Sequence, residues 1–157
     1  MEMELTEKIE LFEKIEAQAR ELISNEKDLE KIYKGIVELL DTNIPYYNWT
    51  GFYMVENGEL VLGHYIGKPT DHIKIQFGQG ICGQAAATKE TFIVDDVSKE
   101  SNYLACSFET ASEIVVPILK DGVVLGEIDI DSDEIAAFDE LDQQLLERIA
   151  TMLAERL

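Results

Sequence analysis

The chain has 157 residues, of which 46% are hydrophobic and 29% charged, a balance typical of one globular domain rather than a disordered segment. Thirty-two acidic residues against 13 basic ones give a net charge of −19. Such a surface repels phosphate backbones and anionic lipids, which argues against nucleic acid and membrane partners; solubility is a sufficient explanation of the charge. The acidic N-terminus lacks the layout of a signal peptide, so we expect a cytoplasmic protein.

Residues 1–43 predict a helical segment. Apolar residues recur at helical spacing in residues 5–23 and again in residues 29–40. Ser24 or Asn25 is expected to cap the second helix, and a proline follows its predicted end near residue 43. These apolar stripes indicate core packing or a dimer contact.

Residues 44–157 predict a sheet followed by a closing helix. Asn57-Gly58 and Asp121-Gly122 are typical of tight hairpin turns, because these residue types tolerate positive φ angles. Hairpins imply an antiparallel sheet with helices on one face, and therefore a single α+β domain over residues 1–157. The predicted strands are residues 49–55, 59–65, 73–77, 91–94, 113–120 and 123–131. Residues 78–87 are a glycine-flanked entry into a short helix, residues 139–156 form the closing helix, and residues 96–112 form a long loop.

Two cysteines are candidates for chemistry. Cys106 lies in the predicted loop, where a thiol can reach a bound molecule as a nucleophile; the alternative is a small buried core residue. Cys82 lies at a glycine-flanked helix start, whose dipole favours a thiolate, although simple helix packing is the better explanation of this residue taken alone. A zinc site with His64 and His72 stays open, but the spacing matches no common zinc finger.

Three acidic residues meet at one end of the second predicted hairpin. Asp129 and Asp131 are two residues apart and therefore share a face of their strand. Strict counting from the two-residue turn places Glu113 opposite Ile130 and on the other face, whereas a one-residue slip would bring it to theirs. Crowded carboxylates raise at least one pKa and can supply a protonated acid; a solvated strand end is the alternative.

Trp49 and Tyr53 share one face of the first predicted strand. With the small Gly51 between them, they could form the wall of a pocket, although core packing is the more common role of such side chains.

Taken together, these motifs resemble one known family, the GAF-domain free methionine-(R)-sulfoxide reductases. The resemblance covers residues 45–157 in order and includes most of the candidate residues above. It is carried by five blocks: residues 48–53 (NWTGFY), 78–83 (GQGICG), 105–106 (AC), 112–117 (SEIVVP) and 129–132 (DIDS).

The resemblance implies a GAF fold and a division of labour at the site. Cys106 matches the family's catalytic cysteine, which becomes a sulfenic acid, and Cys82 matches a second cysteine that could resolve it as a disulfide. The matches to substrate-binding residues are Glu113, Asp129, Asp131, Trp49 and Tyr53. A thioredoxin-like dithiol would complete the cycle, a homodimer is implied, and neither a metal nor an organic cofactor is expected.

The sequence also departs from the family. His72 stands where many members have a third cysteine, and Ser107 follows the catalytic cysteine where an acidic residue is common. These differences concern the recycling route and substrate choice. A GAF sensor that binds a small molecule without turnover is the alternative function. The two cysteines and the carboxylates together favour the enzyme.

Overall fold

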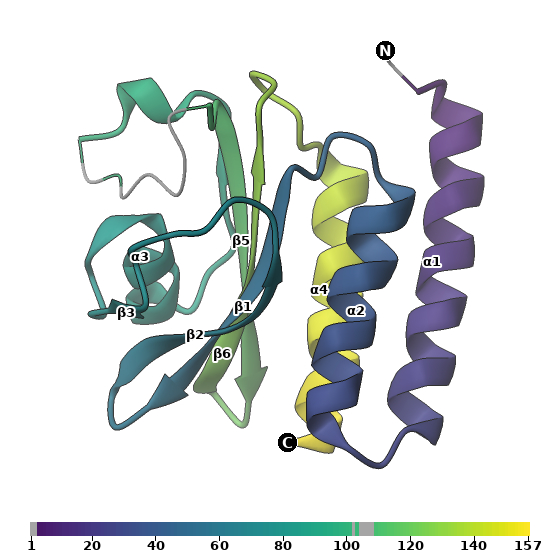
Figure 1. Ribbon diagram of the computed structural model, residues 1–157, viewed down its shortest axis with the longest axis horizontal. Coiled ribbons are helices and arrows are strands. Elements are labelled where there is room, and N and C mark those ends of the chain that lie inside the picture. Colours follow the sequence, from purple (N-terminus) through teal and green to yellow (C-terminus); the bar gives the residue numbers. More distant parts are fainter. Residues whose placement is uncertain (1–2, 102, 104–108) are drawn as a thin grey trace.

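The computed structural model describes residues 3–101, 103 and 109–157 and shows an α+β fold (Figure 1). A six-stranded sheet in the order β3-β2-β1-β6-β5-β4 forms its centre, and every strand pair is antiparallel. The strands are β1 (Trp49–Glu56), β2 (Glu59–Ile66), β3 (Lys74–Ile75), β4 (Phe92–Val94), β5 (Ser112–Lys120) and β6 (Val123–Ser132).

Three long helices cover one face of this sheet. They are α1 (Leu5–Asn25), α2 (Leu29–Asn43) and α4 (Glu140–Arg156), with α4 next to the sheet and α1 outermost in Figure 1. Their apolar stripes pack against strand residues such as Phe52, Ile114 and Ile130 in the larger core. The predicted α+β architecture, with terminal helices on one face, is confirmed. No helix within the described ranges has both the length and the apolar character needed to cross a membrane.

The opposite face of the sheet carries a second, smaller core. The short helix α3 (Gly80–Thr88) lies on this side, and a short 3-10 helix, η1 (Val97–Lys99), lies in the predicted long loop. Ile81 and Cys82 of α3 pack with Trp49, Tyr53 and Val115 from the strands. Placing every helix on one face was therefore wrong for α3. Because strand side chains alternate, the same strands serve an aliphatic core on one side and this mixed core on the other.

Two local predictions also needed correction. Asp28, rather than Ser24 or Asn25, caps α2, since its carboxylate accepts a hydrogen bond from the Glu30 amide at 3.0 Å. The strand predicted at residues 73–77 is only Lys74–Ile75, because a turn begins at Gln76, whose carbonyl accepts from the Gln79 amide at 3.0 Å. The two hairpin turns are confirmed, with positive φ at both Asn57 and Gly58 and at both Asp121 and Gly122.

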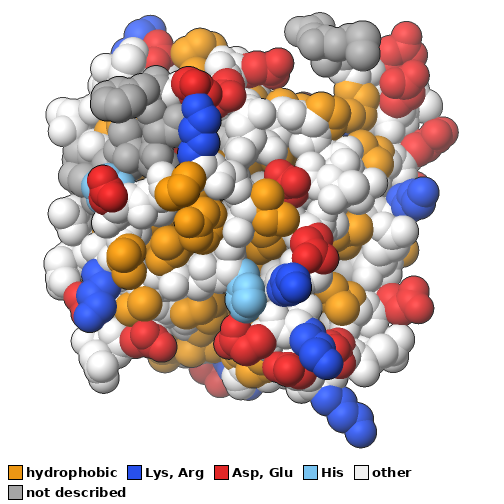
Figure 2. Space-filling model, in the orientation of Figure 1, with side chains coloured by type: hydrophobic (Ala, Val, Ile, Leu, Met, Phe, Trp, Pro, Cys, Tyr) orange, Lys and Arg blue, Asp and Glu red, His pale blue; other side chains and the backbone are white. Residues whose placement is uncertain are grey.

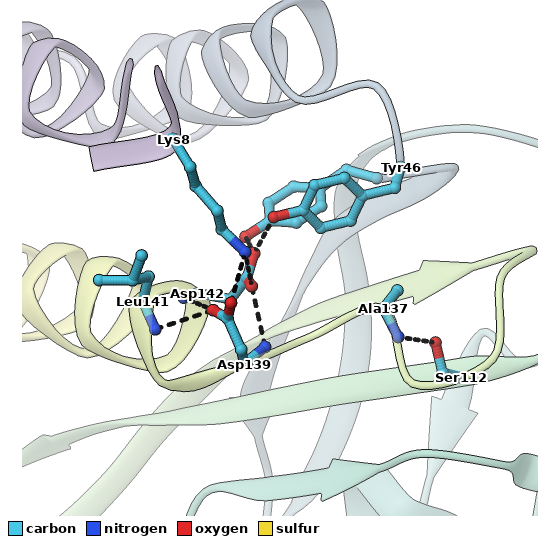
Figure 3. A network of polar contacts seen from close by, with 8 residues as sticks. Lys8, Tyr46, Ser112, Ala137, Asp139, Leu141 and Asp142 are labelled. Carbon is cyan, nitrogen blue, oxygen red and sulfur yellow. Dashed lines mark hydrogen bonds and ion pairs between the residues drawn. The ribbon is translucent and has the colours of Figure 1, made fainter. Parts of the chain in front are cut away.

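A buried polar network joins α1 to the start of α4 (Figure 3). Lys8 of α1 is 8% exposed, and its Nζ lies 2.9 Å from Asp142 Oδ2 and 3.0 Å from Asp139 Oδ2. The Tyr46 and Tyr47 hydroxyls each donate to Asp142 Oδ1 at 2.7 Å. Burial raises the pKa of Asp142, whereas contacts with Lys8 and Asp142 outweigh burial and lower the pKa of Asp139.

Acidic side chains are dispersed over the face of the molecule that Figure 2 shows. On the face shown in Figure 2, the acidic side chains are spread over the surface, with lysine and arginine side chains between some of them. This distribution agrees with a role of the net charge in solubility.

Candidate functional site

A one-residue bulge in the β5–β6 hairpin determines which carboxylates share a face. Pairing starts in strict register at Lys120 and Val123, but Ile118 pairs with Gly126, so Leu125 is an extra residue on β6. Beyond the bulge Glu113 pairs with Asp131. Strict counting was therefore wrong, and the one-residue slip considered above is the observed arrangement. It brings Glu113 to the same face as the β6 carboxylates.

Four carboxylates are buried on this face of the sheet. Glu113, Glu127, Asp129 and Asp131 are all 3% exposed or less. Burial raises the pKa of Asp129, and burial together with the charge of Asp129 raises the pKa of Glu127 well above its usual range. Both shifts favour the protonated form of these carboxyl groups over the carboxylate.

Cys82 lies among these carboxylates. Its Sγ donates to Asp129 Oδ2 at 3.2 Å, and the residue is 5% exposed. Burial raises the pKa of the Cys82 thiol well above its usual range, and the charges of Asp129 and Glu127 raise it further. The expected thiolate stabilisation by the helix start is thus outweighed, and the site holds Cys82 as a thiol that donates to a carboxylate.

A small cavity separates α3 from the sheet at this point. Its volume is about 10 Å³, room for one water molecule or ion and far less than an amino acid needs. It is lined by Tyr53, His72, Ile75, Gly80, Ile81, Cys82, Glu113 and Asp129. The ligand atoms of Cys82, Glu113 and Asp129 lie within 4.8 Å of one another, so these three residues could hold a metal ion.

The two predicted aromatic residues have different positions. Tyr53 lines the cavity, and its hydroxyl donates to the His72 carbonyl at 2.8 Å. Trp49 is 3% exposed, stacks on Tyr65 with ring centroids 5.2 Å apart, and donates from Nε1 to the Lys68 carbonyl at 3.0 Å. Trp49 instead pairs with Asp131 across β1 and β6, further along the same face.

The structure thus brings together Cys82, Glu113, Asp129 and Tyr53, with Trp49 and Asp131 beside them on the sheet. Cys106, the predicted nucleophile, lies outside the described residues. Glu127 was missed from the sequence, although the alternating order Glu127-Ile128-Asp129-Ile130-Asp131 could have indicated it. His72, which the sequence analysis noted at the position of a family cysteine, lines the cavity.

The fold and the buried polar cavity between α3 and the sheet define the class as a GAF-type α+β domain. The model of the GAF domain matches residues 28–157, and the chain belongs to this family. The resemblance inferred from the five blocks is confirmed, since relatives named free methionine-R-sulfoxide reductase are found both by sequence and by structure.

Among curated proteins, the chain is 49% identical over 110 residues to "Free methionine-R-sulfoxide reductase" of Saccharomyces cerevisiae, covering 68% of this chain and 61% of that protein. It is 37% identical over 142 residues to "Protein YtsP" of Bacillus subtilis, covering 89% and 86%. The solved free methionine-R-sulfoxide reductase of Neisseria meningitidis, in complex with its substrate, superposes with a TM-score of 0.91 at 34% identity, covering 99% of this chain and 93% of that chain.

Proposed function

We propose that this protein reduces free methionine-(R)-sulfoxide to methionine by cysteine chemistry. The observation that carries the proposal is the buried Cys82 thiol, 3.2 Å from Asp129 Oδ2, on the GAF face that also contains Glu113 and Tyr53. Further support comes from substrate-bound reductases of N. meningitidis and Staphylococcus aureus, which are 34% and 36% identical to this chain.

In the proposed first half-reaction, the Cys106 sulfur attacks the sulfoxide sulfur. An S–S bond forms while the S–O bond of the substrate breaks, and the oxygen leaves as water after taking the thiol proton and a proton from a carboxyl group. A water molecule then adds to the Cys106 sulfur, the S–S bond breaks, and the products are methionine and a Cys106 sulfenic acid, with the released proton returned to the carboxylate. Burial raises the pKa values of Asp129 and Glu127, which favours the protonated form that this step requires. Glu113, Asp131, Trp49 and Tyr53 are proposed to position the substrate.

In the second half-reaction, Cys82 attacks the sulfenic sulfur. A disulfide between Cys82 and Cys106 forms and water leaves, after which a thioredoxin-like dithiol reduces the disulfide and is itself oxidised. Asp129 accepts the hydrogen bond of the Cys82 thiol and can accept its proton during this attack. A homodimer and a cytoplasmic location belong to the same proposal.

The cavity, with a volume of about 10 Å³, is too small for an amino acid, so the proposed reaction requires the site to open around the substrate. Substrate binding should therefore protect α3 from hydrogen exchange in the complex relative to the free protein. No change in exchange at α3 on addition of saturating substrate would contradict an opening at this cavity.

The decisive test is consumption of free methionine-(R)-sulfoxide with a small dithiol as reductant. We expect turnover by the natural chain and a loss of at least about a thousandfold in the Cys106→Ser variant, since the nucleophile is removed. The (S)-epimer serves as the control substrate. Equal rates for the two proteins would rule out the mechanism, and substrate binding without turnover by the natural chain would favour the GAF sensor.

Replacing Cys82 separates recycling from the chemical step. With thioredoxin as reductant, Cys82→Ser should release about one methionine per protein and then stop, because the sulfenic acid lacks its partner thiol. The burst is measured by rapid quenching and the sulfenic acid by mass spectrometry after trapping. Undiminished multiple turnover would remove Cys82 from this role.

A further inference from the structure

The surroundings of Cys82 are unusual for a buried thiol. Glu113, Asp129 and Glu127 all contribute negative charge at its sulfur. No lysine or arginine is among the described residues that line the cavity. Buried carboxylates are stable in such a place only when they are protonated or matched by a cation.

Glu127 provides an independent indication of a missing ligand. It is 0% exposed, and neither of its carboxylate oxygens has a hydrogen-bond partner among the described residues. The Glu127 side chain lies on the same face of the sheet as Asp129. It is close to Cys82, because the thiol lowers the pKa of Glu127 and so reduces the rise that burial causes. A carboxylate that is buried without a donor normally has a cation, a proton or a water molecule beside it.

The geometry of the cluster is close to that of a small metal site. In a tetrahedral zinc site, with Zn–S near 2.3 Å and Zn–O near 2.0 Å, a sulfur and an oxygen ligand lie roughly 3.5 Å apart. Cys82 Sγ and Asp129 Oδ2 are 3.2 Å apart, and the full set with Glu113 lies within 4.8 Å. The cavity of about 10 Å³ accommodates an ion but no organic ligand.

The donor set restricts the kind of ion. A thiolate selects against Mg²⁺ and Ca²⁺, which prefer oxygen ligands alone, and the carboxylates select against Cu(I). Zn²⁺ binds both thiolate and carboxylate ligands, and the ion is small enough for the cavity.

We propose that Cys82, Glu113 and Asp129 form a binding site for a divalent cation of the zinc type, and that the charge of the neighbouring Glu127 strengthens binding. On binding, the Cys82 S–H bond breaks, its proton leaves to solvent, and a metal–sulfur bond replaces it. The site does not rest on the reductase proposal, because its ligands and their positions are defined without Cys106.

The test uses the Cys106→Ser chain, in which Cys82 is the only thiol, and Co²⁺ as a spectroscopic probe. We expect one equivalent of Co²⁺ to produce a thiolate-to-cobalt charge-transfer band in the near ultraviolet, which Zn²⁺ displaces and Mg²⁺ does not. Also replacing Cys82 with serine should abolish the band. A band that survives this change, or a folded protein that binds no Co²⁺, overturns the proposal.

Two further measurements keep the result independent of folding defects. Glu127→Gln in the Cys106→Ser chain should weaken Co²⁺ binding by about tenfold or more, whereas the exposed Glu134→Gln serves as a control and should not change it. X-ray absorption of the zinc-loaded Cys106→Ser chain should show one sulfur at about 2.3 Å. A spectrum that shows only oxygen and nitrogen ligands around the zinc would overturn the proposed site. Because no sulfoxide is present, either outcome leaves the reductase assay unaffected.

Discussion

At the scale of single residues, Glu127 has the least favourable environment in the described site. It is fully buried, next to another carboxylate, and its oxygens have no described hydrogen-bond donor. Burial and the charge of Asp129 raise the pKa of Glu127 above its unfolded-state value, so folding favours the protonated form. The contribution of Glu127 to the free energy of unfolding is therefore fully present below the unfolded-state pKa of about 4.3. It is lost as the pH rises through the folded-state pKa.

Glu127→Gln should therefore stabilise the protein at alkaline pH. The amide keeps the shape of the side chain and cannot ionise, so a gain of about 1–3 kcal/mol, the usual cost of a buried polar group without a partner, is expected at pH 8. Urea unfolding at pH 4 and pH 8, with a chelator present, measures it. A gain of equal size at both pH values would contradict ionisation as the cause, and the exposed Glu134→Gln should change little at either pH.

At the scale of elements, α1 is attached to α4 by charge as well as by apolar packing. Lys8 is the only basic side chain among the residues joined in the network of Figure 3, and it neutralises Asp142 at the capped start of α4. The model of the GAF domain begins at residue 28, so this link joins a helix outside the matched region to one inside it.

Lys8→Ala should lower the free energy of unfolding by about 3 kcal/mol, because it leaves Asp142 buried without its cation. Lys14→Ala, on the exposed side of α1, is the matched control and should stay within about 0.5 kcal/mol of the natural chain. Urea denaturation measures both. Similar small losses for the two variants would show that the tyrosine hydroxyls alone stabilise Asp142.

At the scale of the whole molecule, the net charge of −19 destabilises the folded state, because folding brings the negative charges closer together and increases their mutual repulsion. Added salt screens this repulsion, so raising NaCl from about 20 to 200 mM should raise the Tm by about 2–4 °C, equivalent to roughly 1 kcal/mol at this size. Calorimetry at pH 7.5 measures the shift. A fall in Tm would indicate that attractive ion pairs dominate the surface instead.

Most of the architecture could be predicted because its signals are local. Helical spacing gave the three long helices, and Asn57-Gly58 and Asp121-Gly122 gave both hairpins. The position of α3 on the second face depends on long-range packing, which periodicity does not encode. At the site, the spacing of Asp129 and Asp131 predicted their shared face, but nothing local to Leu125 indicated a bulge, so the partner of Glu113 was assigned one residue away from its true one.

The bulge at Leu125 has a consequence for the chemistry of the site. Because side chains alternate along a strand, a hairpin that paired these same residues without the bulge would place Glu113 opposite Ile130, toward the aliphatic core under α4. The same change would place Ile114 opposite Asp129, on the face of the thiol. No amino acid at the site would have changed identity, yet its acidity would be rebuilt. In this protein, the pairing register of one hairpin therefore determines the chemistry of the site as much as the carboxylates themselves do.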